Sequence, residues 1–161
     1  MIRAMIGTVA VLAGFAVVER SVDASTGQAG SCTPTDAYAL LQPGESVAVR
    51  AEPALDAIAV GALRGTAGDS RMVVSMSGSQ SGWARIALVD AAQPYGWVPA
   101  DLLRVDAKGS GSFYSRPGPM GQKLATLDGE AGSFRILGCR GTWIQVINAR
   151  KGAGWIDKIQ S

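Results

Sequence analysis

Apolar and polar residues alternate in short runs along most of the chain after residue 46. In the first run, Val47 and Val49 are separated by a single small residue, a period of two that is typical of a strand with one buried face. The same period recurs at Met72, Val74 and Met76, and at Phe134 and Ile136. Glycines interrupt the runs at intervals typical of turns, and no segment after residue 30 keeps a helical period over about 11 residues. The pattern predicts an all-β fold of short strands.

The first 24 residues have a different pattern. Arg3 precedes an uncharged run of 14 residues, Met5–Val18, and Val22-Asp23-Ala24 places small residues around a cleavage point after Ala24. A membrane span needs about 20 apolar residues, whereas the apolar part of a signal peptide has about 7–15. We expect residues 1–24 to form an apolar helix that is either a cleaved signal peptide or an uncleaved inner-membrane anchor. Both alternatives place the rest of the chain outside the cytoplasm, in the periplasm or the extracellular space.

Two segments, residues 46–106 and 112–161, repeat the same order of motifs. We align Arg50 with Arg116 and Pro53 with Pro119 near the start of each segment. The four tryptophans of the protein then fall at paired positions, Trp83 with Trp143 and Trp97 with Trp155. The repeat predicts two domains built alike, preceded by a polar linker over residues 25–45 and joined at Ala107–Gly111.

The motifs of each segment are an aliphatic-x-Arg-x-x-Pro opening, a Leu-x-Gly, a Gly-Trp or Gly-x-Trp, and a terminal Gly-Trp-Val or Gly-Trp-Ile. The second segment carries the clearest version, with Gly141-Thr142-Trp143 and Gly154-Trp155-Ile156. This set resembles the bacterial SH3-like (SH3b) domains of exported envelope proteins. The resemblance implies two small SH3-like barrels in tandem that bind peptidoglycan or an extended peptide. The first segment departs from the family pattern through a longer Ala87–Tyr95 segment.

The two cysteines, Cys32 and Cys139, both follow the apolar N-terminal run. In an oxidising compartment they are candidates for a disulfide, which would close a loop of about 107 residues and stabilise the fold by about 4–5 kcal/mol in the chain-entropy model. The alternative is that Cys139 is a small buried residue and Cys32 a free thiol. The sequence leaves both open.

In each segment, the pattern of the strand that begins at the first tryptophan predicts an outward-facing aromatic surface. Trp83 shares a face with Arg85, and Trp143 shares a face with Gln145, while the aliphatic residues between them face the interior. An exposed indole offers a peptide or sugar a large, rigid contact area. The candidate ligand-binding residues are Trp83, Tyr95, Tyr114, Arg116 and Trp143, whereas Trp97 and Trp155 are expected in the core.

Structural roles compete with ligand binding for several of these residues. Trp83 and Trp143 are alternatively expected to cover the end of a barrel or the contact between the two units. Arg50 and Arg116 are equally suited to bonding the carbonyls of a turn.

Charge and residue content restrict the function further. The formal net charge of +2 excludes a strongly basic nucleic-acid binder, and residues 109–161 carry seven basic and three acidic groups (+4) against five and six (−1) in residues 47–106. Histidine is absent and there are two cysteines, which removes the Ser/His/Asp and Cys/His nucleophile arrangements and the usual zinc sites. We therefore expect no enzyme activity, no cofactor and no metal.

Two functions remain open. The first is an exported, noncatalytic module that binds peptidoglycan or an envelope protein peptide. The second is a structural or scaffolding envelope protein with a protein partner, whose tryptophans form the contact between the two units. Neither involves nucleic acid, and membrane contact is expected only through residues 1–24 if they remain uncleaved.

Overall fold

The computed structural model describes residues 30–67, 71–89, 91–107, 111–127, 132–150 and 152–158, so the expected signal or anchor at residues 1–24 lies outside the described residues. The strands are β1 (Gly30–Leu40), β2 (Ser46–Arg50), β3 (Ala59–Arg64), β4 (Arg71–Gln80), β5 (Trp83–Ala87), β6 (Tyr95–Pro99), β7 (Leu103–Ala107), β8 (Gly111–Tyr114), β9 (Lys123–Leu127), β10 (Gly132–Arg140), β11 (Trp143–Asn148) and β12 (Gly152–Asp157). One short 3₁₀ helix, η1 (Ala100–Leu102), precedes β7. The described part of the chain holds no helix with the length and hydropathy of a membrane span.

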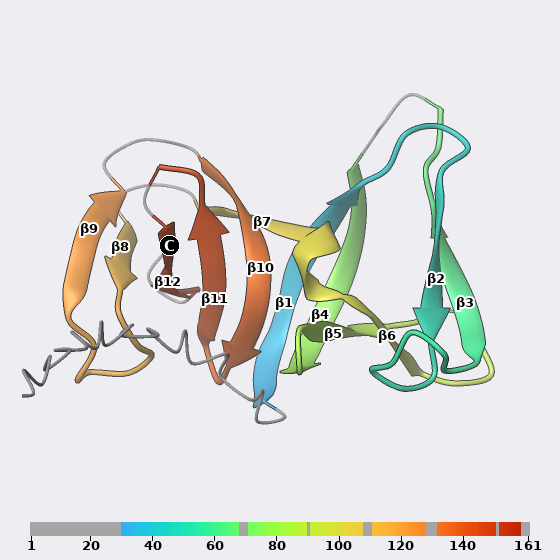
Figure 1. The fold of residues 1–161 in the computed structure, drawn as a ribbon, viewed down its shortest axis with the longest axis horizontal. Helices are drawn as coiled ribbons and strands as arrows, with labels where there is room; N and C mark the ends of the chain where they lie inside the picture. Colours follow the sequence, from blue (N-terminus) through green and yellow to red (C-terminus); the bar gives the residue numbers. More distant parts are fainter. Residues whose placement is uncertain are drawn as a thin grey trace, which may run out of the picture.

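The strands form one antiparallel sheet, in the order β3-β2-β6-β5-β4-β1-β7-β10-β11-β12-β8-β9, which confirms the all-β fold class (Figure 1). Counted inward from either edge, the first half (β2–β6) and the second half (β8–β12) have the same order of strands, since β3-β2-β6-β5-β4 corresponds to β9-β8-β12-β11-β10. Strands β1 and β7 lie between the two halves. The repeat seen in the sequence is therefore present in the strand topology.

The strand register shows which residues of the two halves are equivalent. Arg85 lies opposite Trp97 as Gln145 lies opposite Trp155, and both β4 and β10 contain an irregularity at the same place. The tryptophan pairs of the sequence alignment thus coincide in the structure.

The alignment at the start of the two segments is wrong by two residues. Arg50 lies opposite Trp97, whereas the residue opposite Trp155 is Tyr114 and not Arg116. Arg50 is therefore equivalent to Tyr114. A shift of two residues preserves the alternation of inward and outward side chains, so the hydrophobic pattern does not distinguish the two alignments.

The expectation of a polar linker over residues 25–45 is wrong for most of this segment. It contains β1, an 11-residue strand that pairs with both β4 and β7. Its N-terminal part is rich in Ser, Thr and Pro, a composition typical of a loop. Partners on both sides impose the extended conformation, and Ala37, Tyr38 and Ala39 of this strand are buried.

A continuous hydrophobic core passes through both halves. Its inward residues are those that the alternation predicts, because Ala84 and Ile86 of β5 and Ile144 and Val146 of β11 are at most 1% exposed.

The glycine of each terminal Gly-Trp-Val or Gly-Trp-Ile motif admits a neighbouring core side chain. A Cβ atom on Gly96 would overlap the side chain of Val49, and one on Gly154 would overlap the ring of Phe113. Val49 and Phe113 are equivalent residues of β2 and β8, and both are completely buried. The motif therefore has the same packing role in both halves.

Candidate functional site

All four indoles are half-buried on the outer side of the sheet. This is the predicted position for Trp83 and Trp143, but not for Trp97 and Trp155, which we expected in the core. The inward positions of β6 and β12 belong to the residues on either side of these tryptophans, such as the fully buried Val98 and Ile156. The period of two therefore turns Trp97 and Trp155 outward.

On the second half, Tyr114 and Trp143 form an edge-to-face pair with ring centroids 5.2 Å apart. Trp155 lies on the same outer side, opposite both Tyr114 and Gln145 in the register. The three aromatic residues thus gather on one face, although Tyr114 and Trp143 contact each other and leave less of their rings for a ligand.

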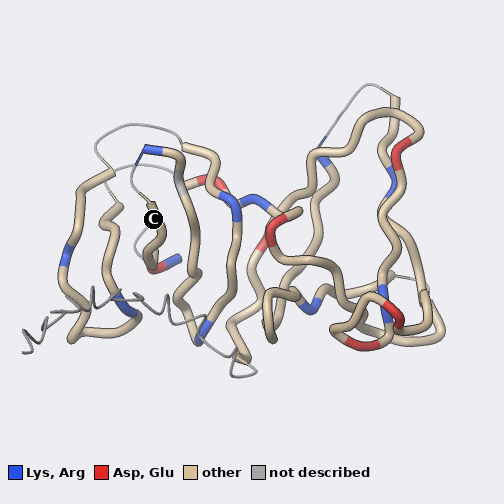
Figure 2. Tube along the Cα trace, in the orientation of Figure 1, with Lys and Arg blue, Asp and Glu red and all other residues tan. Residues whose placement is uncertain are grey.

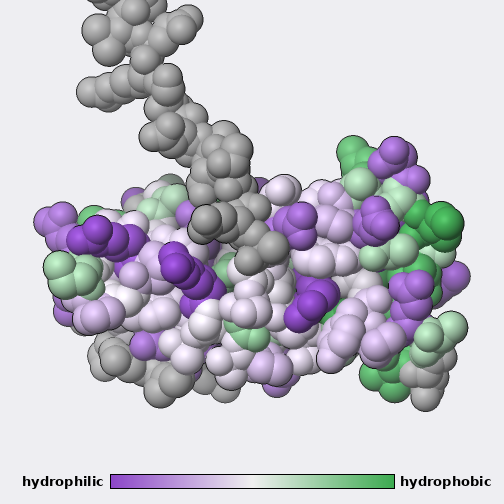
Figure 3. All heavy atoms as spheres, turned by 90° about the horizontal axis from the view of Figure 1, so that it is seen from below, coloured by the Kyte–Doolittle hydropathy of each residue, from purple (hydrophilic) through white to green (hydrophobic). Residues whose placement is uncertain are grey.

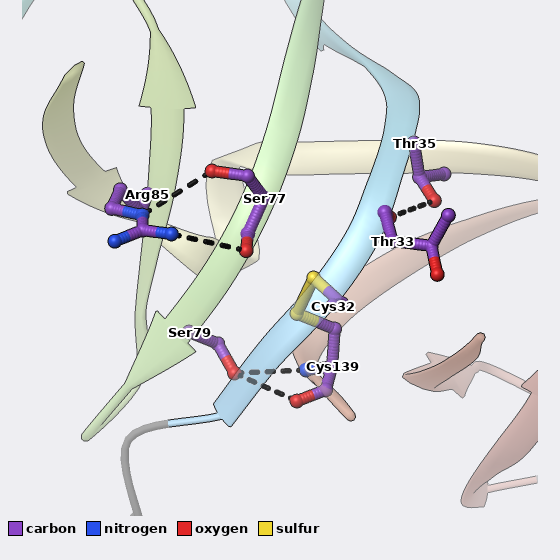
Figure 4. The surroundings of a disulfide bond; sticks show 7 residues. All are labelled: Cys32, Thr33, Thr35, Ser77, Ser79, Arg85 and Cys139. Atoms are coloured by element: carbon purple, nitrogen blue, oxygen red, sulfur yellow. Dashed lines mark hydrogen bonds between the residues drawn. A yellow bond between two sulfur atoms is a disulfide. The ribbon is translucent and has the colours of Figure 1, made fainter. Parts of the chain in front are cut away.

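On the first half, a cation packs against the exposed aromatic ring. The guanidinium of Arg85 lies 5.1 Å from the ring centroid of Tyr95, which is 47% exposed. The Nε of Arg85 also donates a hydrogen bond to Ser77 Oγ at 3.2 Å (Figure 4). Arg85 replaces the neutral Gln145 of the second half, so the two outer faces differ in charge.

Arg50 and Arg116 each bond a carbonyl of the loop that follows them. Arg50 Nη1 donates to the carbonyl oxygen of Ala57 at 2.9 Å, and Arg116 Nε donates to that of Met120 at 2.8 Å. Both side chains therefore hold a turn in place, the structural role that the sequence left open.

A pocket of about 590 Å³ lies where the two halves meet, and we name it the junction pocket. The N-terminal end of β1 and the C-terminal ends of β4 and β10 lie at the same end of the central strands (Figure 1). Its lining residues are Gly30, Ser31, Ser79, Gln80, Ser81, Gly82, Pro117, Leu137, Gly138, Cys139, Arg140, Gln145 and Trp155. The pocket thus combines one indole, two smaller apolar side chains, several hydroxyl and amide groups and one cation.

The five ligand-binding residues expected from the sequence do not line this pocket. It is instead lined by Trp155, by Gln145, and by Pro117 next to Arg116. The sequence did mark Gln145 as outward-facing beside Trp143 and Cys139 as a disulfide candidate, but Gly30 and Ser79 carried no signal. These residues come together because β1 lies beside β4, and the sequence pattern does not predict a strand at β1.

The floor of the pocket is fixed by covalent and hydrogen bonds. Cys32 and Cys139 form a disulfide, which confirms one of the two alternatives left by the sequence (Figure 4). The Ser79 hydroxyl accepts a hydrogen bond from the amide of Cys139 at 2.9 Å and donates one to its carbonyl at 3.3 Å. Three strands, β1, β4 and β10, are thereby joined at the pocket.

A polar cluster on the four central strands, β4, β1, β7 and β10, contains Tyr38, Arg71, Asp106 and Ser133. The Tyr38 hydroxyl donates to Asp106 Oδ1 at 2.6 Å and lies 2.8 Å from Ser133 Oγ, while Arg71 pairs with Asp106 Oδ2 at 2.8 Å. Burial, reinforced by the hydrogen bond to Asp106, raises the pKa of Tyr38 above 10.0. The cluster joins β1, β4, β7 and β10 through side chains.

These four central strands contain no tryptophan. The strands that join the two halves therefore do so without tryptophan, and Trp155 is the one indole that lines the junction pocket.

The surface is uneven in charge and in hydropathy. In the described part of the second half, basic residues outnumber acidic ones (Figure 2): Arg116, Lys123, Arg135, Arg140, Arg150 and Lys158 stand against Asp157. Apolar side chains gather at the end of the molecule that carries the first half (Figure 3). The large exposed apolar residues in the loops after β2 and β5 are Leu55, Ile58 and Val89, which are 78%, 79% and 86% exposed.

Among the described residues, no group of three or more His, Cys, Asp or Glu side chains is arranged to hold a metal ion. No protein-family model matches the chain, and no curated protein is similar to it. Among solved structures, the chain is similar to NlpC2 from Trichomonas vaginalis, with 18% sequence identity, a TM-score of 0.33 and coverage of 80% of this chain. The match covers 47% of that protein, so this chain spans about half of its length.

Proposed function

We propose that the protein is a noncatalytic, exported binding module that holds a segment of peptidoglycan in the junction pocket. The observation that carries the proposal is the lining of this pocket, where the half-buried Trp155 stands beside Gln145 and a row of serines. Binding sites for small or extended ligands combine an apolar surface with a few polar groups that fix orientation. Sugar rings and peptide methyl groups pack on indole faces, and hydroxyl and amide groups bond their polar edges.

We further propose that each half is a small SH3-like barrel of the SH3b type. The motifs of the two segments support this assignment, as does the identical order of strands counted inward from both edges of the sheet. In this proposal the glycine of each terminal Gly-Trp-Val or Gly-Trp-Ile motif belongs to the barrel interior, and the tryptophan after it belongs to the outer surface.

Export is supported by the disulfide, because structural disulfides persist mainly in oxidising compartments. The apolar run of residues 5–18 supplies the signal or the inner-membrane anchor in this proposal. The protein then works in the periplasm or outside the cell, where peptidoglycan is accessible.

The test is co-sedimentation of the purified protein with purified peptidoglycan sacculi. We expect Trp155→Ala to reduce the bound fraction about tenfold, because the variant removes the main apolar wall of the pocket. Trp97→Ala is the matched control, since Trp97 is the equivalent half-buried indole of the first half but does not line the pocket. Equal binding by folded wild type and Trp155→Ala contradicts the proposal.

The second candidate function, a scaffolding protein with a protein partner, is favoured by the exposed apolar residues Leu55, Ile58 and Val89. It predicts no retention on sacculi for the wild type or either tryptophan variant. The same experiment therefore separates the two functions.

A further inference from the structure

Arg140 is the one ionisable side chain among the residues that line the junction pocket. It ends β10 and lies opposite Trp143, and its side chain is exposed. Within the described part of the chain, no hydrogen bond or ion pair engages its guanidinium. A free cation at the rim of a pocket without a lining carboxylate is a site for a negative group on a ligand.

The equivalent position in the first half shows that this charge is specific to one side of the pocket. Gln80 ends β4 opposite Trp83 as Arg140 ends β10 opposite Trp143, and both side chains line the pocket. The repeat has therefore placed a neutral amide and a cation at matched positions. A ligand that carries its negative group at one end fits this asymmetry, because only one end of the pocket attracts it.

We infer that the ligand of the junction pocket carries a free carboxylate, such as the terminal carboxylate of a peptidoglycan stem peptide, and that this carboxylate pairs with Arg140. The inference rests on the proposed function and names the part of peptidoglycan that the pocket takes. The planar guanidinium matches the two oxygens of a carboxylate and bonds both of them. The methyl groups of alanine residues in the stem pack against Trp155, Pro117 and Leu137, the apolar lining residues.

The probe is diacetyl-L-Lys-D-Ala-D-Ala with a free C-terminal carboxylate, compared with the same peptide as its C-terminal carboxamide. Isothermal titration calorimetry measures the affinity of both for the wild type and for Arg140→Gln. Glutamine is chosen because Gln80 occupies the equivalent position in the first half. We expect the wild type to bind the acid about tenfold more tightly than the amide, and Arg140→Gln to bind both equally weakly.

Arg135→Gln is the matched control, since Arg135 is an exposed arginine of the same strand that does not line the pocket. This variant has the same change in net charge and should keep the tenfold preference for the acid. Loss of the preference in both variants overturns the pairing with Arg140, because it assigns the effect to net charge.

The outcomes separate this inference from the proposed function. If the protein sediments with sacculi through Trp155 but does not distinguish acid from amide, the carboxylate inference is wrong and the proposed function stands. If the protein binds neither peptide nor sacculi, both are wrong. A preference for the acid that survives in Arg140→Gln shows that another group takes the carboxylate.

Discussion

The hydroxyl of Ser79 lies within hydrogen-bond distance of both the amide (2.9 Å) and the carbonyl (3.3 Å) of Cys139. The two residues occupy equivalent places in the two halves, since Ser79 lies opposite Ala84 and Cys139 opposite Ile144. One repeat has used this position for a hydroxyl, which bonds the second half, and the other for a disulfide sulfur, which joins the second half to β1.

We predict that Ser79→Ala lowers the free energy of unfolding by about 1–3 kcal/mol, because it leaves a buried amide and carbonyl without this partner. Urea denaturation followed by tryptophan fluorescence measures the change. Ser75→Ala, on the same strand, is the control, and we expect it to change stability by less than about 0.5 kcal/mol. Equal stability of the wild type and Ser79→Ala would show that the two hydrogen bonds contribute nothing.

Reduction of the disulfide between Cys32 and Cys139 is expected to cost about 2–5 kcal/mol, since the bond joins residues 107 positions apart. Urea denaturation with and without dithiothreitol measures this difference. The double variant Cys32→Ala/Cys139→Ala should match the reduced protein and be insensitive to the reductant. A stability that does not change on reduction contradicts the prediction.

Gly154→Ala should destabilise the protein by about 1–3 kcal/mol, because the new methyl group overlaps the buried ring of Phe113. Gly61→Ala provides a contrast on β3, where the methyl group meets only Leu88 at 3.6 Å and Val49 at 3.8 Å. We expect this second change to be close to neutral. Thermal unfolding of both variants measures the difference, and equal melting temperatures would contradict the packing role of the Gly-Trp motif.

The raised pKa of Tyr38 predicts a loss of stability at alkaline pH. The folded protein holds the phenol proton more tightly than the unfolded chain does, so the contribution of this group is fully present below pH 10.0 and falls as the pH rises through the folded-state pKa. The difference in free energy of unfolding between wild type and Tyr38→Phe should therefore be constant near neutral pH and shrink above pH 10.0. A difference that grows with pH would reverse the sign of the argument.

Strands β5 and β11 were predictable from the sequence because their inward residues alternate strictly. Apolar residues such as Ile86 and Val146 occupy every second position of these strands, and burial of one face of a sheet selects this pattern. The pairing of Trp83 with Trp143 was predictable for the same reason, since both precede such a run.

Strand β1 was not predictable, because its composition is that of a loop and its conformation comes from the strands on either side of it. The outward position of Trp97 and Trp155 was missed because hydrophobicity suggested burial, while the packing of Val49 and Phe113 over the preceding glycines decides it. The junction pocket requires β1, β4 and β10 to meet, and the two cysteines indicate only the meeting of β1 with β10, so the place of Ser79 beside them was not predictable.

Strand β1 also makes the two repeats depend on each other. In the backbone ladder, the first repeat connects to the second through β1, which pairs with β4 and β7, and through β7, which pairs with β10. A chain cut after Ala107 would leave β10 of the second fragment paired only with β11, and β7 of the first fragment paired only with β1. The molecule should accordingly unfold as a single cooperative unit, because one sheet and one hydrophobic core pass through both repeats.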